Sequence, residues 1–313
     1  MVVAYTEWNN DLLYSLTFGF YRAAMKLKAT LKGHSSGIYK LLVEGHFLFS
    51  ASGDGMLAAW DLNTFEPAPF SVKVGLPIFA AAARNEIILI GQGDGGIHIV
   101  NRESKQELRH LKYHDKGVFD ILYNLHHNHY YSTGGGGSMA VFDGDDYKLI
   151  MQIPLSSGKL RRLLLTDDSK HLIVTASDGN IHILDAEYFN QVQTVHGHDG
   201  GTYAAAWLAK NRLVTGGRDA HLRFWEYADY QLNEIGDIPA HNYAIYDILN
   251  LSDNMFASAS RDRNVKIWNI DDLQNPHRLM DPSTTHANSV NALCKTNKYL
   301  ITAGDDRMIK IWE

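Results

Sequence analysis

The stretch SASRDRNVKIWN, residues 258–269, returns 44 residues later as TAGDDRMIKIWE, residues 302–313. Each copy begins with small residues, continues through a turn that contains an Asp, and ends with alternating apolar residues and a Trp. Weaker copies precede them, and alignment of all copies brings one position into register seven times. This position holds Trp60, Val100, Phe142, Leu184, Trp225, Trp268 and Trp312.

Successive occurrences of this position are 40 to 44 residues apart. A period of this length is typical of the four-stranded blades of a propeller. Apolar residues alternate within each copy, as in Val265 and Ile267, whereas Gly, Asp and Asn mark the turns, so the intervening segments are predicted to be strands. No copy has a convincing helical period. The sequence therefore predicts an all-β protein built from seven repeated units.

Four units open with a complete or recognisable Gly-His pair, at Gly33-His34, Gly197-His198, Ala240-His241 and Thr285-His286, and each closes with Trp and a polar residue. In these features the sequence resembles the WD-repeat family. The resemblance implies a seven-bladed β-propeller in which each unit supplies the outer strand of one blade and the inner strands of the next. This offset implies that a strand at about 25–31 completes the last blade. Residues 25–313 then form the propeller, and residues 1–24 an N-terminal extension.

The sixth unit contains His241, Ser258, Asp262 and Trp268 at positions that repeat in three other units. A turn Asp can accept a hydrogen bond from the imidazole, and the Ser hydroxyl can bond both the other ring nitrogen and the indole N–H. We expect such a chain to tie separate segments of one blade together. Its fourfold recurrence favours a structural role over a catalytic triad. The equivalent sets are His34, Ser50, Asp54 and Trp60; His198, Thr215, Asp219 and Trp225; and His286, Thr302, Asp306 and Trp312.

The composition narrows the classes of function. The chain has 29 Lys and Arg against 35 Asp and Glu and lacks a strongly basic cluster, so nucleic acid is not expected as a partner. Cys294 is the only cysteine, which favours a reducing, cytoplasmic location. The apolar run Leu12 to Tyr21 is too short to span a membrane and follows acidic residues, unlike a signal peptide.

Two glycine motifs and a histidine cluster resemble sites for chemistry. Gly91, Gly93 and Gly96 spell G-x-G-x-x-G, but an alternating strand follows them where a phosphate site needs a helix. Residues 134–137 lack the Lys-Ser/Thr of a phosphate loop. A metal site in the segment 126–129, which has three histidines, is conceivable, but an exposed turn is favoured because neither Cys nor a clear carboxylate set accompanies them. We therefore predict no catalytic residue, metal site or cofactor.

Five residues after each opening histidine, or after the position aligned with it, most units have an aromatic residue. The resemblance implies that this column lies on the innermost strands near the upper opening of the channel and often recognises partners. Aromatic and Arg side chains suit that role because they dominate hot spots of binding. The alternative is that the rings fill space between blades. The column consists of Tyr39, Phe79, Phe119, Arg161, Tyr203, Tyr246 and Asn291.

Arg218 and Arg261 precede the turn Asp in neighbouring units. With Arg161 they are predicted to form a basic rim suited to carboxylate or phosphate groups, unless each pairs with a nearby Asp. We therefore expect a monomeric, non-catalytic scaffold or adaptor that binds other proteins or peptides, including acidic segments, at the upper face and channel entrance. The alternative is a reader of a modified or acidic peptide, or of a small ligand, at the aromatic and Arg rim.

Overall fold

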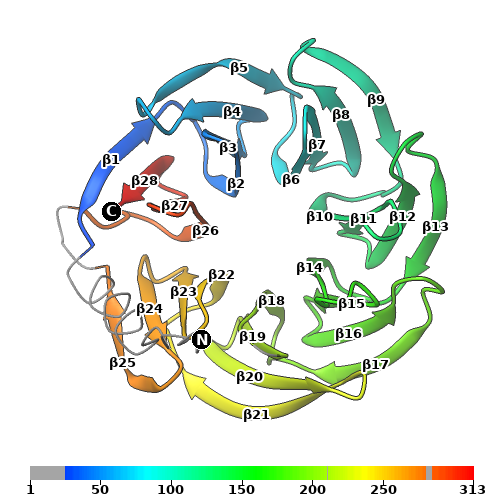
Figure 1. Cartoon of the computed structure of the whole chain (residues 1–313), viewed down its shortest axis with the longest axis vertical. Helices are drawn as coiled ribbons and strands as arrows, with labels where there is room; N and C mark the ends of the chain where they lie inside the picture. Colours follow the sequence, from blue (N-terminus) through cyan, green and yellow to red (C-terminus); the bar gives the residue numbers. More distant parts are fainter. Residues whose placement is uncertain (1–24, 210, 280–283) are drawn as a thin grey trace, which may run out of the picture.

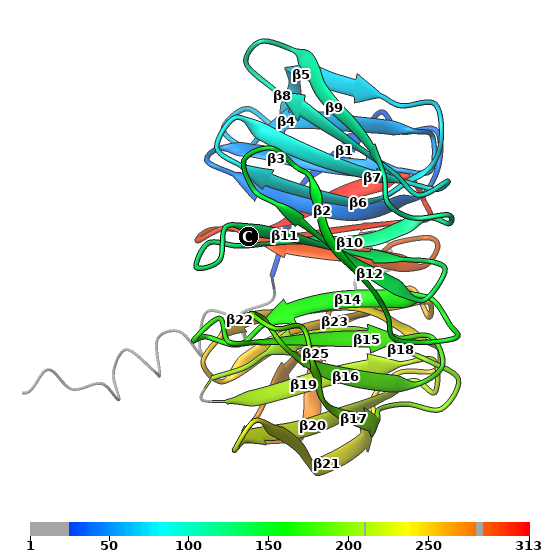
Figure 2. The ribbon, with the colours of Figure 1, turned by 90° about the vertical axis from the view of Figure 1, so that its right-hand side faces the viewer.

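The computed structural model describes residues 25–209, 211–279 and 284–313, so the predicted extension at 1–24 lies outside the described residues. All regular structure in the described part is β, and its strands form seven four-stranded antiparallel sheets. Figure 1 shows these sheets arranged as blades around a central axis, and Figure 2 shows the ring from its edge. The predicted seven-bladed propeller is therefore confirmed. No described segment forms a helix long and apolar enough to cross a membrane.

Six blades use four consecutive strands each, ordered from the channel outwards. The first blade consists of β2 (Ile38–Glu44), β3 (Phe47–Ser52), β4 (Met56–Asp61) and β5 (Glu66–Lys73). The second consists of β6 (Ile78–Arg84), β7 (Ile87–Gln92), β8 (Gly96–Asn101) and β9 (Gln106–Lys112). The third consists of β10 (Val118–Asn124), β11 (His129–Gly134), β12 (Ser138–Asp143) and β13 (Leu149–Pro154).

The same order holds for the next three blades. The fourth blade consists of β14 (Leu160–Leu165), β15 (His171–Ala176), β16 (Asn180–Asp185) and β17 (Gln191–His196). The fifth consists of β18 (Thr202–Trp207), β19 (Arg212–Gly217), β20 (His221–Ala228) and β21 (Gln231–Pro239). The sixth consists of β22 (Ile245–Ser252), β23 (Met255–Ser260), β24 (Val265–Asn269) and β25 (Asp272–Arg278).

The seventh blade joins two distant parts of the chain. It consists of β26 (Val290–Lys295), β27 (Leu300–Gly304), β28 (Met308–Trp312) and, as its outer strand, β1 (Leu27–Lys32). β1 runs antiparallel to β28 with Thr30 opposite Lys310, and Lys26 and Glu313 exchange backbone hydrogen bonds of 2.9 and 3.0 Å beyond the strands. The predicted closing strand is confirmed, and it lies one to two residues later than expected.

The hydrophobic core is divided into layers between blades. In one such layer, Leu31 and Ile301 of the seventh blade pack with Ile38 of the first blade. Inner strands such as β15 are buried throughout, whereas an outer strand such as β9 is almost entirely exposed. Burial of apolar faces between neighbouring blades is the main force that holds such a ring together. The surfaces left for binding are the loops, the outer strands and the ends of the innermost strands around the channel.

Candidate binding site at the channel entrance

The predicted hydrogen-bond chains form in four blades of the described structure. In the sixth blade, the Nδ1 of His241 lies 2.9 Å from the carboxylate of Asp262, and its Nε2 lies 2.7 Å from the hydroxyl of Ser258. The indole N–H of Trp268 donates to the same hydroxyl at 2.8 Å. The corresponding distances in the first, fifth and seventh blades are 2.7 to 3.1 Å.

These sets have the properties of structural ties. The His241 side chain has no exposed surface, and that of Asp262 is only 5% exposed. Burial alone raises the pKa of Asp262, but the hydrogen bond and charge of His241 outweigh it and hold this pKa well below the ordinary value. The repeated His, Ser and Asp side chains therefore hydrogen-bond within the blades and have a structural role.

The third blade has an incomplete set. The Nε2 of His114 is 2.8 Å from the hydroxyl of Ser132, but its buried Nδ1 has no hydrogen-bond partner among the described residues. Gly136 stands where the complete sets have their Asp, and Phe142 stands in place of Trp. Because burial disfavours the imidazolium ion and no carboxylate bonds to the ring, the pKa of His114 falls to about 4.

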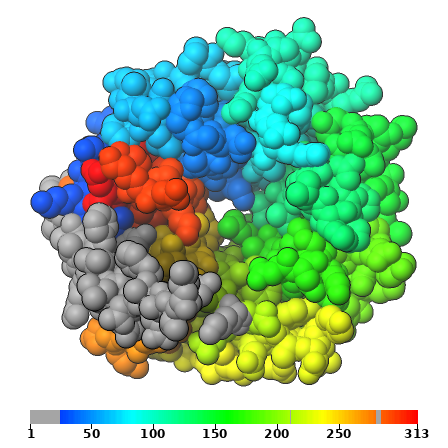
Figure 3. Space-filling model, viewed as in Figure 1, coloured from blue at the N-terminus to red at the C-terminus, as the bar shows by residue number. Residues whose placement is uncertain are grey.

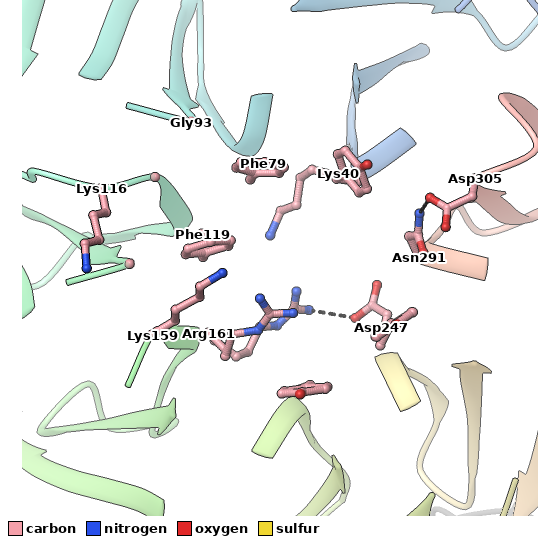
Figure 4. Close-up of a pocket in the computed structure, with 16 residues that line it drawn as sticks. Lys40, Phe79, Gly93, Lys116, Phe119, Lys159, Arg161, Asp247, Asn291 and Asp305 are labelled. Atoms are coloured by element: carbon pink, nitrogen blue, oxygen red, sulfur yellow. Dashed lines mark hydrogen bonds and ion pairs between the residues drawn. The ribbon is translucent and has the colours of Figure 1, made fainter. Parts of the chain in front are cut away.

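All seven residues of the predicted column meet in one cavity of about 550 Å³ at one end of the channel. We call this cavity the entrance. The strands β2, β6, β10, β14, β18, β22 and β26 supply one column residue each. Figure 3 shows the opening at the centre of the ring, and Figure 4 shows side chains from several blades converging on it. The structure thus brings together the aromatic column that the repeat defines.

The column residues touch one another in a continuous arc. The ring of Phe79 lies 5.2 Å from that of Tyr39 and stacks on Phe119 with centroids 5.4 Å apart. The guanidinium of Arg161 lies 5.1 Å from the Phe119 ring and 4.8 Å from the Tyr203 ring. Tyr203 in turn stacks on Tyr246 at 6.2 Å. The rings therefore pack against their neighbours and also line the cavity, and their role in partner recognition stays a prediction.

A charged network lies directly beside this arc. The carboxylate of Asp120 is 2.7 Å from the ammonium of Lys40 and accepts a hydrogen bond of 3.0 Å from the backbone of Leu163 in the next blade. Arg162 lies 3.4 Å from Asp247 and 3.9 Å from Asp120. Burial would lower the pKa of Arg162, but the carboxylates of Asp247 and Asp120 raise it overall. These four charges compensate one another and connect blades across the channel.

The basic part of the entrance differs from the predicted rim. Arg218 and Arg261 are exposed and do not line the entrance, and Arg261 lies over the ring of Tyr243 at 5.7 Å. The described ion pairs include neither of them, nor Arg161. The Arg–Asp pairs of the alternative are thus not among the ion pairs of the described residues. Arg161 lines the entrance as predicted, but rings of the arc flank its guanidinium on both sides.

Two lysines that sequence reasoning missed complete the basic side of the entrance. Lys116 and Lys159 line the cavity and are exposed. The Lys159 ammonium lies 5.4 Å from the ring of Phe119, and Figure 4 shows both lysines on the same side as Phe119 and Arg161. They precede column residues by three and two positions, in loops between blades. A search for basic residues just before the column would have found them.

The glycine motifs have packing roles. A Cβ on Gly91 would lie 2.7 Å from the Val118 side chain of the next blade, and the strand β8 follows the motif as predicted. Residues 134–137 form the corresponding β11–β12 hairpin. His126 and His127 lie in the predicted turn between β10 and β11. The glycine motifs and two of the three histidines thus lie in hairpin turns as predicted, whereas His129 begins β11 and is half-buried.

The closed ring, its repeated hydrogen-bond ties and its lined entrance define a seven-bladed β-propeller with a candidate binding site on its axis. The family model described as WD domain, G-beta repeat, matches residues 25–61, 189–226, 232–269 and 280–313. The chain belongs to the WD-repeat family. The matched segments contain the four complete sets of His, Ser or Thr, Asp and Trp, whereas the intervening repeats lack members of the set.

Proposed function

We propose that this protein is a non-catalytic interaction module that binds an acidic segment of a partner protein at the entrance. The observation that carries the proposal is the local excess of positive charge. Lys116 and Lys159 are exposed on the same side of the entrance as Arg161, and no described carboxylate forms an ion pair with any of them. Clustered cations in a concave site attract carboxylate or phosphate groups, and such attraction accelerates encounter with an acidic partner.

The aromatic arc complements these charges. Tyr39, Phe79 and Phe119 are each partly exposed at the entrance and are held in place by contact with their neighbours. Rigid aromatic side chains bury a large area on binding and lose little side-chain entropy. A partner segment with an apolar residue beside its acidic group would therefore use both halves of the site.

The contacts of Arg161 disfavour the alternative of a cage for a methylated ammonium group. Such a cage needs an open space between aromatic faces. Here the guanidinium of Arg161 is already in contact with Phe119 and Tyr203, and Lys159 adds a second cation near Phe119. A further cation would be repelled at the same faces. The geometry supports an anionic ligand.

Selection of peptides from a random display library tests the proposal. We expect enrichment of Asp, Glu or phosphorylated residues, and we expect the double variant Lys116→Glu, Lys159→Glu to lose binding of a selected peptide. The matched control is Arg218→Glu, Arg261→Glu, which makes the same change of charge at two arginines that do not line the entrance. Selected peptides without acidic enrichment, or equal loss of binding in both double variants, would contradict the proposal.

A further inference from the structure

The outer part of the second blade contains a group of potential metal ligands that lies outside the entrance. The strands β8 and β9 pair with His98 directly opposite His110, and Glu107 lies opposite Val100 on the same face. One nitrogen from each imidazole and one carboxylate oxygen of Glu107 all lie within 4.8 Å of one another. Among the described residues, no other group of three His, Cys, Asp or Glu side chains meets this spacing.

The hydrogen bonds of His98 are incomplete. Its Nδ1 lies 2.7 Å from the carboxylate of Glu107, while its buried Nε2 has no hydrogen-bond partner among the described residues. The side chain is 14% exposed because its face of β8 looks towards the first blade, with which Val100 packs. The two nitrogens of an imidazole point in divergent directions, so Nδ1, which faces Glu107, is the atom of His98 that can join a metal site with this carboxylate.

The ring of His110 is held next to His98. The two imidazoles stack with centroids 4.2 Å apart and planes 8° from parallel. Gly96 leaves the room for this arrangement, since a Cβ at this position would lie 2.6 Å from the Nε2 of His110. Glu107 and His110 are exposed, so solvent and ions reach the group from the outside.

The surrounding charges permit a cation. Lys112 follows His110 by two residues, but its ammonium is 2.7 Å from the carboxylate of Asp94 and also donates to the Asp94 carbonyl. The ammonium of Lys112 is therefore neutralised by an acidic partner. Glu107 supplies the negative charge that would face the metal.

We propose that His98, Glu107 and His110 form a binding site for a divalent transition metal, with zinc as the reference ion. Two imidazoles and one carboxylate are a common set of ligands for zinc, and they leave a fourth position of its tetrahedron to water. Because the nitrogens of parallel rings do not converge, the exposed ring of His110 must turn out of the stack to bind the ion. The ring nitrogens must be unprotonated to bind, so metal affinity falls as the solution is made acidic. A bound ion would link the outermost strand of the second blade to its neighbour.

Titration with zinc alone, after removal of metals with a chelator, tests this site in the full-length protein. Isothermal titration calorimetry should show one equivalent of zinc, and histidine NMR signals of two rings should shift. We expect the separate variants His110→Ala and Glu107→Gln to weaken binding by about tenfold or more, because even partners of metal ligands change affinity by 10–100-fold. Circular dichroism checks that both variants remain folded.

The control uses the other histidine-rich turn of the protein. The variant His126→Gln, His127→Gln should bind zinc as the unmodified protein does. Unchanged affinity in His110→Ala and Glu107→Gln, loss of binding in the control variant, or no zinc binding at pH 7.5 would each overturn the proposal.

Discussion

Removal of the Asp262 carboxylate isolates the contribution of one hydrogen-bond tie. In Asp262→Ala the Nδ1 of His241 loses its partner at 2.9 Å, and the backbone N–H groups of Asn242 and Asn264 lose bonds of 3.1 and 2.9 Å. The imidazole is fully buried, so water cannot replace the carboxylate. An unsatisfied buried polar group costs about 1–3 kcal/mol, and we expect the free energy of unfolding to fall by this amount.

The fourth blade provides a matched control. Asp178 occupies the same turn position and accepts hydrogen bonds from the backbone of Asn180 at 2.9 Å and from the hydroxyl of Ser156 at 2.5 Å, but no described histidine bonds to it. The bond from Ser156 is exposed, so water can replace its partner at little cost. The difference between Asp262→Ala and Asp178→Ala in urea denaturation therefore reports mainly the buried bond to His241. NMR titration should show the pKa of His241 in Asp262→Ala moving towards that of His114, about 4. Equal destabilisation by the two substitutions would refute the reasoning.

Gly136→Asp should supply the missing partner of His114, raise its pKa above about 4 and increase stability by about 1 kcal/mol, as measured by NMR and urea denaturation. Burial lowers the pKa of His114 from 6.5 to about 4, so the unfolded state binds more protons than the folded state in this range. The stability due to this residue therefore falls by about 3 kcal/mol as the pH drops from about 6.5 to about 4. His114→Gln should flatten the pH dependence of stability in the same range. Arg162→Met leaves Asp247 without its cation, and we expect a loss of about 2 kcal/mol in denaturant melts, with no loss refuting a cohesive role for this network. Deletion of residues 25–32 should expose the edge of β28 and lower the melting temperature of the whole domain or cause self-association, whereas an unchanged monomeric melt would contradict closure by β1.

The repeat made much of the architecture predictable because every unit solves the same packing problem. Once the Trp268 position was in register, the hydrogen-bond ties followed from the chemistry of the repeated residues. The strand order and the place of the aromatic column came from the resemblance to WD repeats. The column residues meet in one cavity because the innermost strand has the same geometry in each blade and directs Tyr39 and its counterparts to the same place.

What the repeat could not predict depends on loops and on local pairing. Arg218 aligned with the column before the turn Asp, but a long side chain in a turn can point away from the axis, and this one does not line the entrance. Lys116 precedes its column residue by three positions and Lys159 by two, so the two lysines do not align with each other in the repeat. His98 and His110 are twelve residues apart, and only the register of β8 against β9 places them face to face.

The pairing of β1 with β28 also determines when the ring can be completed during synthesis. Thr30 and its partner Lys310 are 280 residues apart, so a ribosome makes the outer strand of the seventh blade long before the strand that receives it. Until β28 has been synthesised, β1 has no strand to pair with. Lys26, Lys28 and Lys32 are exposed along it, and charged side chains of this kind discourage premature association with the edges of other sheets. Among the described strand pairs, β1 and β28 are the farthest apart in sequence, so their pairing carries the largest loop-closure entropy, and those lysines protect β1 until it forms.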